Sequence, residues 1–210
     1  MRPRTVRVPS VLLACVLAFS VGWAASPVAA AERDALDALD ALDALDAIAI
    51  GDSVMLGAKS QLQRAGVGTV DAKVSRQASS GVDLIRKRGP ELPEHVVVHL
   101  GTNGTHSVKT CRQIVRAVGK GRTVYLINFK VPRSWEDPNN RILDKCDRKF
   151  RSDRVVILDW HSLASQNPEY LYADGYHLRP EGAEAFAKMV RKAITAPRAP
   201  YSDRLDLTRR

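Results

Sequence analysis

Short apolar runs, each ending at a glycine or a polar residue, alternate along the chain with stretches whose apolar residues recur at helical spacing. Uninterrupted apolar runs are typical of strands buried on both faces. They predict strands at residues 47–50, 70–74, 96–100, 123–129 and 155–160. The stretches between them predict helices at about 53–64, 83–88, 111–118, 140–150 and 180–194. Residues 131–139, with two prolines and Trp135, predict a loop.

Strands that alternate with helices predict an α/β fold, a three-layer α/β/α sandwich around a central, mostly parallel sheet. In such a sheet, ligands bind beyond the carboxyl ends of the strands. Three segments follow predicted strand ends: Gly51-Asp52-Ser53, Gly101-Thr102-Asn103-Gly104 and the loop after Trp160. We therefore expect them to meet at one edge of the sheet.

The first 31 residues have the features of an export signal. Arg2, Arg4 and Arg7 precede an apolar stretch at 11–23, and small residues follow as far as Ala31, where we place cleavage. The alternatives are an uncleaved anchor and a lipoprotein site at Cys15. The lipoprotein interpretation is weaker, because the apolar sequence continues well past that cysteine. The expected location is outside the cytoplasm, secreted or associated with the cell wall.

Residues 32–46 are dominated by a repeated Asp-Ala-Leu unit. Its period of three matches neither a helix nor a strand, so we interpret this segment as a linker. The predicted catalytic domain follows at 47–196, and residues 197–210 form a basic tail that we expect to be disordered.

Composition indicates a soluble globular domain, with 45% hydrophobic and 26% charged residues. The formal charge of +9 falls to about +6 once the three leader arginines are removed. A positive surface favours acidic partners such as cell-wall polymers or lipid headgroups, although it equally suits a solvated face. Basic clusters interleaved with aromatic residues are missing, which argues against nucleic acid.

Two cysteines, Cys111 and Cys146, remain after the predicted cleavage. An even pair in an oxidising compartment favours one disulfide over two buried thiols. No third ligand accompanies them at zinc-site spacing, so no metal is expected.

The candidate nucleophile is Ser53, at the start of a helix that follows a buried strand. Such a serine needs a base within hydrogen-bond reach, and the base needs an orienting carboxylate. Asp174 and His177, three residues apart in a glycine-containing loop, supply both. The Asn103 side chain is suitably placed to donate to an oxyanion. These residues also have plain structural interpretations: Ser53 as a helix cap, His177 as a surface histidine and Asn103 as a turn residue.

The three motifs together, in this order and spacing, resemble the SGNH (GDSL-type) hydrolases, which have a flavodoxin-like fold. The resemblance covers about residues 47–194. The segments 51–58, 71–77 and 131–135 are similar to the extracytoplasmic SGNH domain of peptidoglycan O-acetyltransferases and related acyltransferases. This resemblance implies Ser53 as nucleophile, His177 as base and Asp174 as its orienter. It also implies an oxyanion hole made by the Ser53 N–H, a backbone N–H near Ser75 and the Asn103 side chain.

The chain departs from the family pattern at two positions. Ser75 stands where the family usually has glycine, and Gly104 stands where many members have aspartate. In the acetyltransferases the domain usually follows a membrane acyltransferase module, which this sequence does not contain. The acyl group would therefore come from a membrane partner or an external donor, or the enzyme would hydrolyse esters.

We expect a serine esterase or O-acyltransferase that acts on O-acyl groups, notably O-acetyl groups, of cell-envelope carbohydrate or small esters. Arg76, Arg133 and Trp135 are candidate substrate contacts. The chemistry requires no cofactor, and we expect a monomer. The alternatives are a non-catalytic wall-binding or partner-binding module on the same fold, and a lipase-like esterase, which the aromatic content of 6% disfavours.

Overall fold

One parallel sheet forms the centre of the domain in the computed structural model, which describes residues 44–150 and 154–197. Its strand order is β2-β1-β3-β4-β5, and every pairing is parallel. The strands are β1 (Leu45–Gly51), β2 (Val67–Ala72), β3 (His95–His99), β4 (Thr123–Ile127) and β5 (Val155–Leu158). The predicted α/β fold is confirmed. The predicted signal, nearly all of the linker and all but the first residue of the tail lie outside the described residues.

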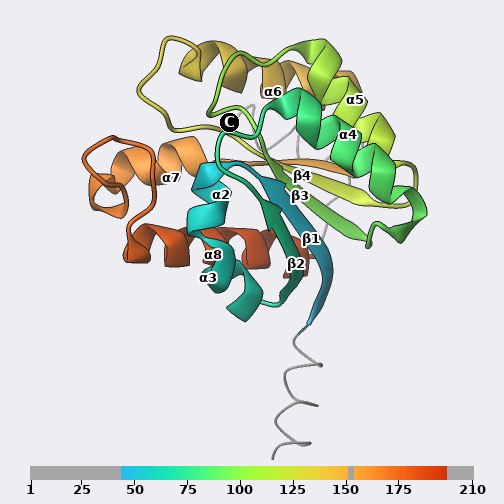
Figure 1. Cartoon of the computed structure of the whole chain (residues 1–210), viewed down its shortest axis with the longest axis horizontal. Helices are drawn as coiled ribbons and strands as arrows, with labels where there is room; N and C mark the ends of the chain where they lie inside the picture. The colour runs from blue at the N-terminus through green and yellow to red at the C-terminus, as the bar shows by residue number, and fades with distance from the viewer. Residues whose placement is uncertain (1–43, 151–153, 198–210) are drawn as a thin grey trace, which may run out of the picture. The chain divides into compact units, whose positions relative to one another are not determined.

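Helices cover both faces of the sheet (Figure 1). One layer holds α4 (Ala78–Arg88), α5 (Val108–Val118) and α6 (Glu136–Phe150); the other holds α3 (Lys59–Arg64) and α8 (Pro180–Thr195). Two short helices, α2 (Ser53–Gly57) and α7 (Trp160–Gln166), start just beyond strand ends, and the 3-10 turns are η1 (Gly89–Glu91) and η2 (Pro168–Tyr170).

The strand pattern divides the core into two halves. Successive side chains of a strand point to opposite faces. In β1, Ala47 and Ala49 pack towards α3 and α8, whereas Ile48 and Ile50 pack towards α4 and α5. The nearly continuous burial of β1, β3 and β4 explains why these strands read as plain apolar runs.

A disulfide joins two helices within the layer that holds α4, α5 and α6. Cys111 of α5 and Cys146 of α6 are both fully buried and are bonded to each other, which agrees with the pairing expected from the cysteine count.

Several predicted boundaries were wrong. The helix predicted at 53–64 is interrupted at Ala58, which separates α2 from α3. The predicted loop at 131–139 ends early, because α6 begins at Glu136. Pro138 is compatible with this start, since a proline in the first helical turn forfeits no intrahelical hydrogen bond.

The segment after β5 also differs from the prediction. The strand ends at Leu158 and Asp159 caps α7, so Trp160 begins a helix instead of ending a strand. Trp160 is fully buried against Phe186, and core packing is therefore its role. The helix predicted at 83–88 extends back to Ala78, and β2 covers Val67–Ala72 where residues 70–74 were predicted.

The strand order reverses between β1 and β3. The chain proceeds from β1 outward to β2 and then crosses back to β3 on the other side of β1. Parallel sheets bind ligands where the order reverses in this way. Both Ser53, just after β1, and Asn103, just after β3, lie at this point.

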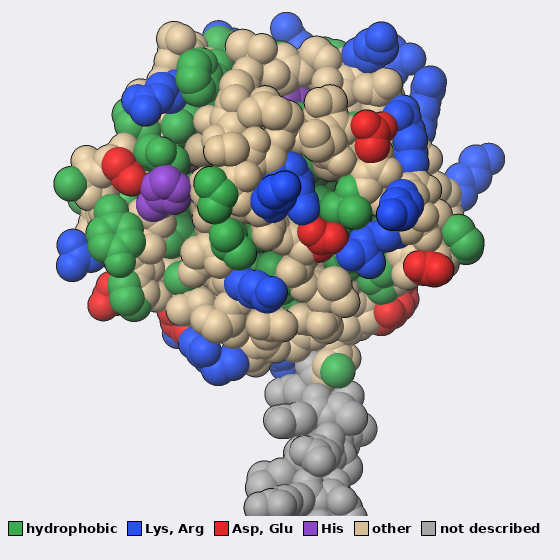
Figure 2. Space-filling model, in the orientation of Figure 1, with side chains coloured by type: hydrophobic (Ala, Val, Ile, Leu, Met, Phe, Trp, Pro, Cys, Tyr) green, Lys and Arg blue, Asp and Glu red, His purple; other side chains and the backbone are tan. Residues whose placement is uncertain are grey.

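The face of the domain drawn in Figure 2 is mixed in charge. Lys and Arg side chains are spread among acidic and neutral ones there without forming one basic patch (Figure 2). Within residues 44–150 and 154–197, none of the helices has both the length and the apolar character to cross a membrane.

Candidate active site

Ser53 is the first residue of α2 and follows the end of β1 by two positions. The preceding Asp52 is the helix N-cap, and its Oδ1 accepts a hydrogen bond from the backbone N–H of Val54 at 3.1 Å. The first N–H groups of a helix have no intrahelical acceptor. The N-cap role therefore belongs to Asp52, and the Ser53 hydroxyl is left for other partners.

That hydroxyl lies against the imidazole of His177. Nε2 of His177 is 3.1 Å from Oγ of Ser53, and Nδ1 is 2.7 Å from Oδ2 of Asp174. Hydroxyl, imidazole and carboxylate thus form one hydrogen-bonded series, which is the arrangement that activates a serine nucleophile. The three residues expected to act together are brought together.

The loop that carries Asp174 and His177 is braced by its own backbone. Oδ1 of Asp174 accepts from the N–H groups of Tyr176, at 3.1 Å, and His177, at 3.0 Å, so the second oxygen is directed at the imidazole. The N–H of Tyr172 donates to the carbonyl of His177 at 2.9 Å. The ring of Tyr176 packs on the imidazole with centroids 4.1 Å apart.

Gly175 is required at its position in this loop. It has a φ of 77°, a conformation that side chains disfavour. A Cβ there would also lie 3.3 Å from the ring of Pro132. The close approach fixes the base-bearing loop against the segment that leads into α6.

Asp174 is ionised at neutral pH. Partial burial by itself would raise the pKa of Asp174, but the hydrogen bonds from the His177 side chain and from the backbone of His177 and Tyr176, and the charge of His177, bring that pKa below 3.8. A carboxylate in this state holds the imidazole in one tautomer and stabilises the imidazolium that forms when the serine gives up its proton.

A second carboxylate, Asp52, joins the ends of β1 and β3 beneath the nucleophile. It is fully buried, and its Oδ2 accepts from the Thr102 N–H at 3.3 Å while Oδ1 lies 3.3 Å from Nδ1 of His99. Burial by itself would raise the pKa of Asp52, but the charge of His99 and hydrogen bonds from His99, Thr102 and Val54 lower it. His99 is a hydrogen-bonded core residue, packed between Phe129 and Phe186.

The two further loops expected to stabilise an oxyanion lie beside Ser53. Gly51 pairs with Ala72 of β2 on one side and with His99 of β3 on the other. Ser75 follows β2 closely, and Asn103 follows β3. Nδ2 of Asn103 donates to the carbonyl of Arg76 at 3.5 Å, which connects the two loops.

Ser75 has an unusual backbone conformation. Its φ of 58° makes it the one non-glycine residue with positive φ in the described part of the chain. Such a conformation is costly for a residue with a Cβ and is the reason a glycine is common there. Strained backbone of this kind is often found at functional sites. A pocket of about 550 Å³ borders this loop, lined by residues 73–77, Ser80 and Leu84.

The three candidate substrate contacts differ in their exposure and in their partners within the protein. Arg76 bonds within the protein: its guanidinium pairs with Asp71 at 2.7 Å and donates to the Gly51 carbonyl at 3.3 Å. Arg133 is exposed on the Pro132 side of the site. Trp135 is half-buried, and its Nε1 donates to the carbonyl of Thr102 at 3.2 Å.

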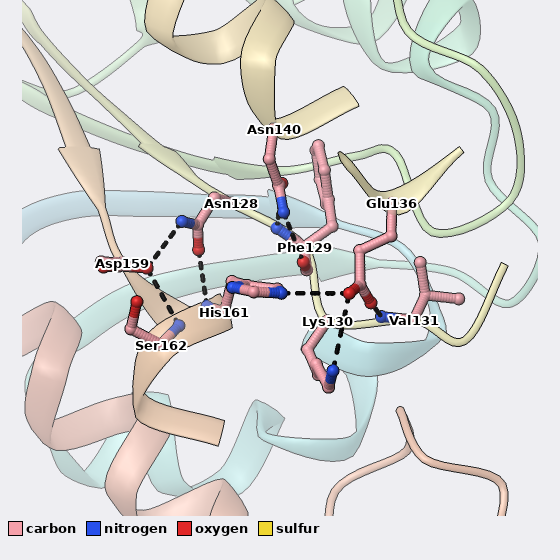
Figure 3. Close-up of polar contacts among 9 residues, drawn as sticks. All are labelled: Asn128, Phe129, Lys130, Val131, Glu136, Asn140, Asp159, His161 and Ser162. Atoms are coloured by element: carbon pink, nitrogen blue, oxygen red, sulfur yellow. Dashed lines mark hydrogen bonds and ion pairs between the residues drawn. The ribbon is translucent and has the colours of Figure 1, made fainter. Parts of the chain in front are cut away.

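A polar network that no sequence pattern indicates lies beyond the ends of β4 and β5 (Figure 3). Glu136 accepts from the Val131 N–H, and its Oε1 lies 3.0 Å from Nε2 of His161 and 3.5 Å from Nζ of Lys130. Glu136, His161 and Asp137 place potential metal-ligating atoms within 4.8 Å of one another. Both Glu136 oxygens already have partners, and one of these partners is the Lys130 ammonium. The network therefore serves to fix the loop after β4.

A second residue that the sequence did not reveal is Asn139, in the first turn of α6. Its side chain is fully buried and bonds the loop that carries Asn103. In sequence it is one polar residue in a proline-containing stretch, where nothing distinguishes it from its neighbour Asn140.

Comparison with known proteins gives consistent similarities, although no family model matches the chain. The chain is 37% identical over 150 residues to YrhL of Bacillus subtilis, which covers 70% of this chain and 23% of that protein. It is 33% identical over 147 residues to the peptidoglycan O-acetyltransferase OatA of Listeria monocytogenes, covering 68% of this chain and 23% of OatA. The chain therefore spans less than a quarter of the length of these relatives.

A solved structure with the same fold is the C-terminal catalytic domain of peptidoglycan O-acetyltransferase A from Streptococcus pneumoniae, determined with a methylsulfonyl adduct. The two share 25% sequence identity with a TM-score of 0.60, over 72% of this chain and 93% of that domain. The part of this chain that matches is thus similar to a catalytic domain taken from a longer protein.

Proposed function

We propose a function from the premise that this chain belongs to the SGNH (GDSL-type) hydrolase superfamily. It is a serine esterase or O-acyltransferase that moves O-acyl groups, in the first place O-acetyl groups, of cell-envelope carbohydrate through an acyl-enzyme on Ser53. The acyl group and the carbohydrate are inferred from the peptidoglycan O-acetyltransferases it resembles.

The observation that carries the proposal is the series from Ser53 Oγ to His177 Nε2, at 3.1 Å, and from His177 Nδ1 to Asp174 Oδ2, at 2.7 Å. As Oγ attacks the ester carbonyl, its proton passes to Nε2 and the C–Oγ bond forms. The lowered pKa of Asp174 keeps it negative while the imidazolium exists.

The oxyanion of the tetrahedral intermediate would be held by the Ser53 N–H, the backbone N–H at Ser75 and the Asn103 side chain. Donors that are fixed in place before reaction stabilise the charge that develops in the transition state, at no cost of reorganisation. Ser75 adopts a φ of 58°, and the Asn103 side chain donates a hydrogen bond to the carbonyl of Arg76. The fold therefore fixes the position of both residues.

Collapse of this intermediate releases the alcohol, which takes the proton from His177, and leaves the acyl group on Ser53. A hydroxyl of a carbohydrate, or water, then gives its proton to Nε2 and attacks the acyl carbon. The second collapse returns the proton to Ser53. Transfer and hydrolysis differ in which hydroxyl reaches the acyl-enzyme.

We propose the acyl donor and the location from the same similarity. A relative is named a peptidoglycan O-acetyltransferase, and peptidoglycan lies outside the cytoplasm. We place the enzyme in the extracytoplasmic space as a monomer, supplied with acyl groups by a membrane acyltransferase partner or by an external ester. No cofactor takes part in any step.

The test is an acyl-chain-length series on chromogenic esters, with and without a chitooligosaccharide acceptor, together with labelling by a fluorophosphonate. Preference for acetyl esters and a new acetylated oligosaccharide would support transfer, and turnover without that product would support hydrolysis. Rising activity with chain length would indicate a lipase. A folded protein that neither labels nor turns over any ester would indicate a binding module and contradict the proposal.

A further inference from the structure

Asn139 connects α6 to the loop that follows β3. Its Nδ2 donates to the carbonyl of Gly101 at 3.0 Å and to that of Gly104 at 2.8 Å, and its Oδ1 accepts from the N–H of His106 at 2.6 Å. The side chain has no exposed surface. An amide offers two N–H donors and one oxygen, and all three groups are used on one loop.

The groups that Asn139 binds lie on both sides of Asn103. Two further bonds hold Thr102, the residue before it: Nε1 of Trp135 donates to its carbonyl at 3.2 Å, and its N–H donates to Asp52 at 3.3 Å. Since the carbonyls of Gly101 and Gly104 share one amide group, the backbone between them has little freedom to move.

We infer that Asn139 is a positioning residue for the oxyanion donor Asn103. It does not touch the ester; it fixes the 101–106 loop so that the Asn103 amide faces the place where the oxyanion forms. The inference rests on the proposed role of Asn103. A displacement of a catalytic group by about 1 Å can cost on the order of 10²-fold in rate, so a buried anchor of the loop should control kcat.

The neighbouring Asn140 is a matched control. Its Oδ1 accepts from the Phe129 N–H at 2.8 Å and its Nδ2 donates to the Phe129 carbonyl at 2.9 Å, so it makes the same kinds of bond to a different loop. In either residue, a change to aspartate keeps the acceptor and removes the donor. The two variants release different loops, and because Asn139 is fully buried and Asn140 half-buried, Asn139→Ser and Asn140→Ser give the same comparison without a buried charge.

The first test compares Asn139→Asp with Asn140→Asp on a chromogenic acetyl ester. We expect Asn139→Asp to lower kcat by roughly 10- to 100-fold with little change in KM, because only transition-state binding depends on the oxyanion donor. Asn140→Asp should keep the kcat of the parent protein. Equal losses in the two variants would overturn the inference.

The second test repeats the change in an Asn103→Ala background. If Asn139 acts through Asn103, the added Asn139→Asp change should cost little further kcat once the donor is gone. The same loss in both backgrounds would overturn the inference. Should the buried aspartate prevent folding, Asn139→Ser provides the same comparison without a charge.

Backbone hydrogen exchange gives a readout that needs no turnover. Asn139→Asp or Asn139→Ser should speed exchange across residues 101–106, whereas Asn140→Asp should leave that segment protected. Unchanged protection there would overturn the inference even for an active enzyme. A parent protein with no ester turnover would instead contradict the proposed function, and the exchange result would still decide whether Asn139 orders the loop.

Discussion

Nε2 of His177 lies 3.1 Å from Oγ of Ser53, across a sequence separation of 124 residues. The contact joins the first turn after β1 to the loop that precedes α8. Neither residue has this partner by local folding, so the contact exists only in the assembled sheet. The Ser53 hydroxyl is thereby the atom on which the proposed chemistry depends.

Replacing Ser53 by alanine should reduce kcat on an acetyl ester by at least about 10³-fold, because removal of the nucleophile leaves only binding and oxyanion stabilisation. Fluorophosphonate labelling should disappear with it. Ser60→Ala is the control, since Ser60 is exposed on α3 and bonds only Gln61 at 2.8 Å among the contacts found for its side chain in the described residues. Labelling that persists in Ser53→Ala would show that another residue is the nucleophile.

Asp174→Asn should lower kcat by roughly 10²- to 10⁴-fold and leave the fold intact. The amide can still accept from the N–H groups of Tyr176 and His177 through its oxygen. The atom facing His177 Nδ1 becomes a donor, so the imidazole loses its orienting acceptor. Steady-state kinetics and circular dichroism of this variant should be compared with those of Asp83→Asn, whose carboxylate pairs with Arg86 on the exposed side of α4. An Asp174→Asn enzyme with the kcat of the parent protein would contradict the proposed role of Asp174.

Asp52 should make the free energy of unfolding depend on pH. The folded-state pKa of Asp52 lies below its ordinary value of 3.8. The stabilisation from its carboxylate is therefore fully present above pH 3.8 and is lost as the pH falls through the folded pKa. Asp52→Asn should cost about 1.5–3 kcal/mol at pH 7, the range for a hydrogen bond to a charged group.

Urea unfolding at several pH values between 7 and 3 tests this prediction. The difference between the parent protein and Asp52→Asn should shrink as the pH falls below 3.8, because the carboxylate of the unfolded chain takes up a proton first and the folded carboxylate follows at its lower pKa. A difference that stays constant over the whole range would mean that Asp52 contributes no titrating stabilisation.

Loss of the disulfide should destabilise the domain. Cys111 and Cys146 are separated by 35 residues and are fully buried. For a loop of this length, the entropy of the unfolded chain predicts a loss of about 3–4 kcal/mol when both residues become alanine. Urea unfolding of the double variant measures it, with the parent protein plus reductant as the second sample. Unfolding midpoints that coincide for oxidised and reduced parent protein would refute the prediction.

Much of the candidate site could be predicted because its signals are local. A strand buried on both faces must be apolar, so the runs at 47–50 and 96–100 marked β1 and β3 directly. The rule that sites lie at the carboxyl ends of parallel strands then placed Ser53 and Asn103 at one edge. The spacing of Asp174 and His177 put carboxylate and imidazole within reach in a single loop.

Boundaries and supporting contacts could not be obtained in this way. The first turn of α6 contains Pro138 and several polar residues, a composition shared with loops, so its start at Glu136 depends on packing. Arg76 had the features of a surface cation available to substrate. Its pairing with Asp71 follows from the path of the chain between β2 and α4.

The sequence by itself determined the order of the strands along the chain, the chemistry at their ends and the pair of cysteines. The first two depend on residues close together in the chain, and the third depends only on the number of cysteines. Only the tertiary structure decided which side chains support that chemistry. The bonds of Asp52 to His99 and Thr102, and of Asn139 to the Asn103 loop, join residues 33 to 50 positions apart. Polar residues such as these become specific partners only when packing removes water from around them, and no local pattern encodes which pairs will meet.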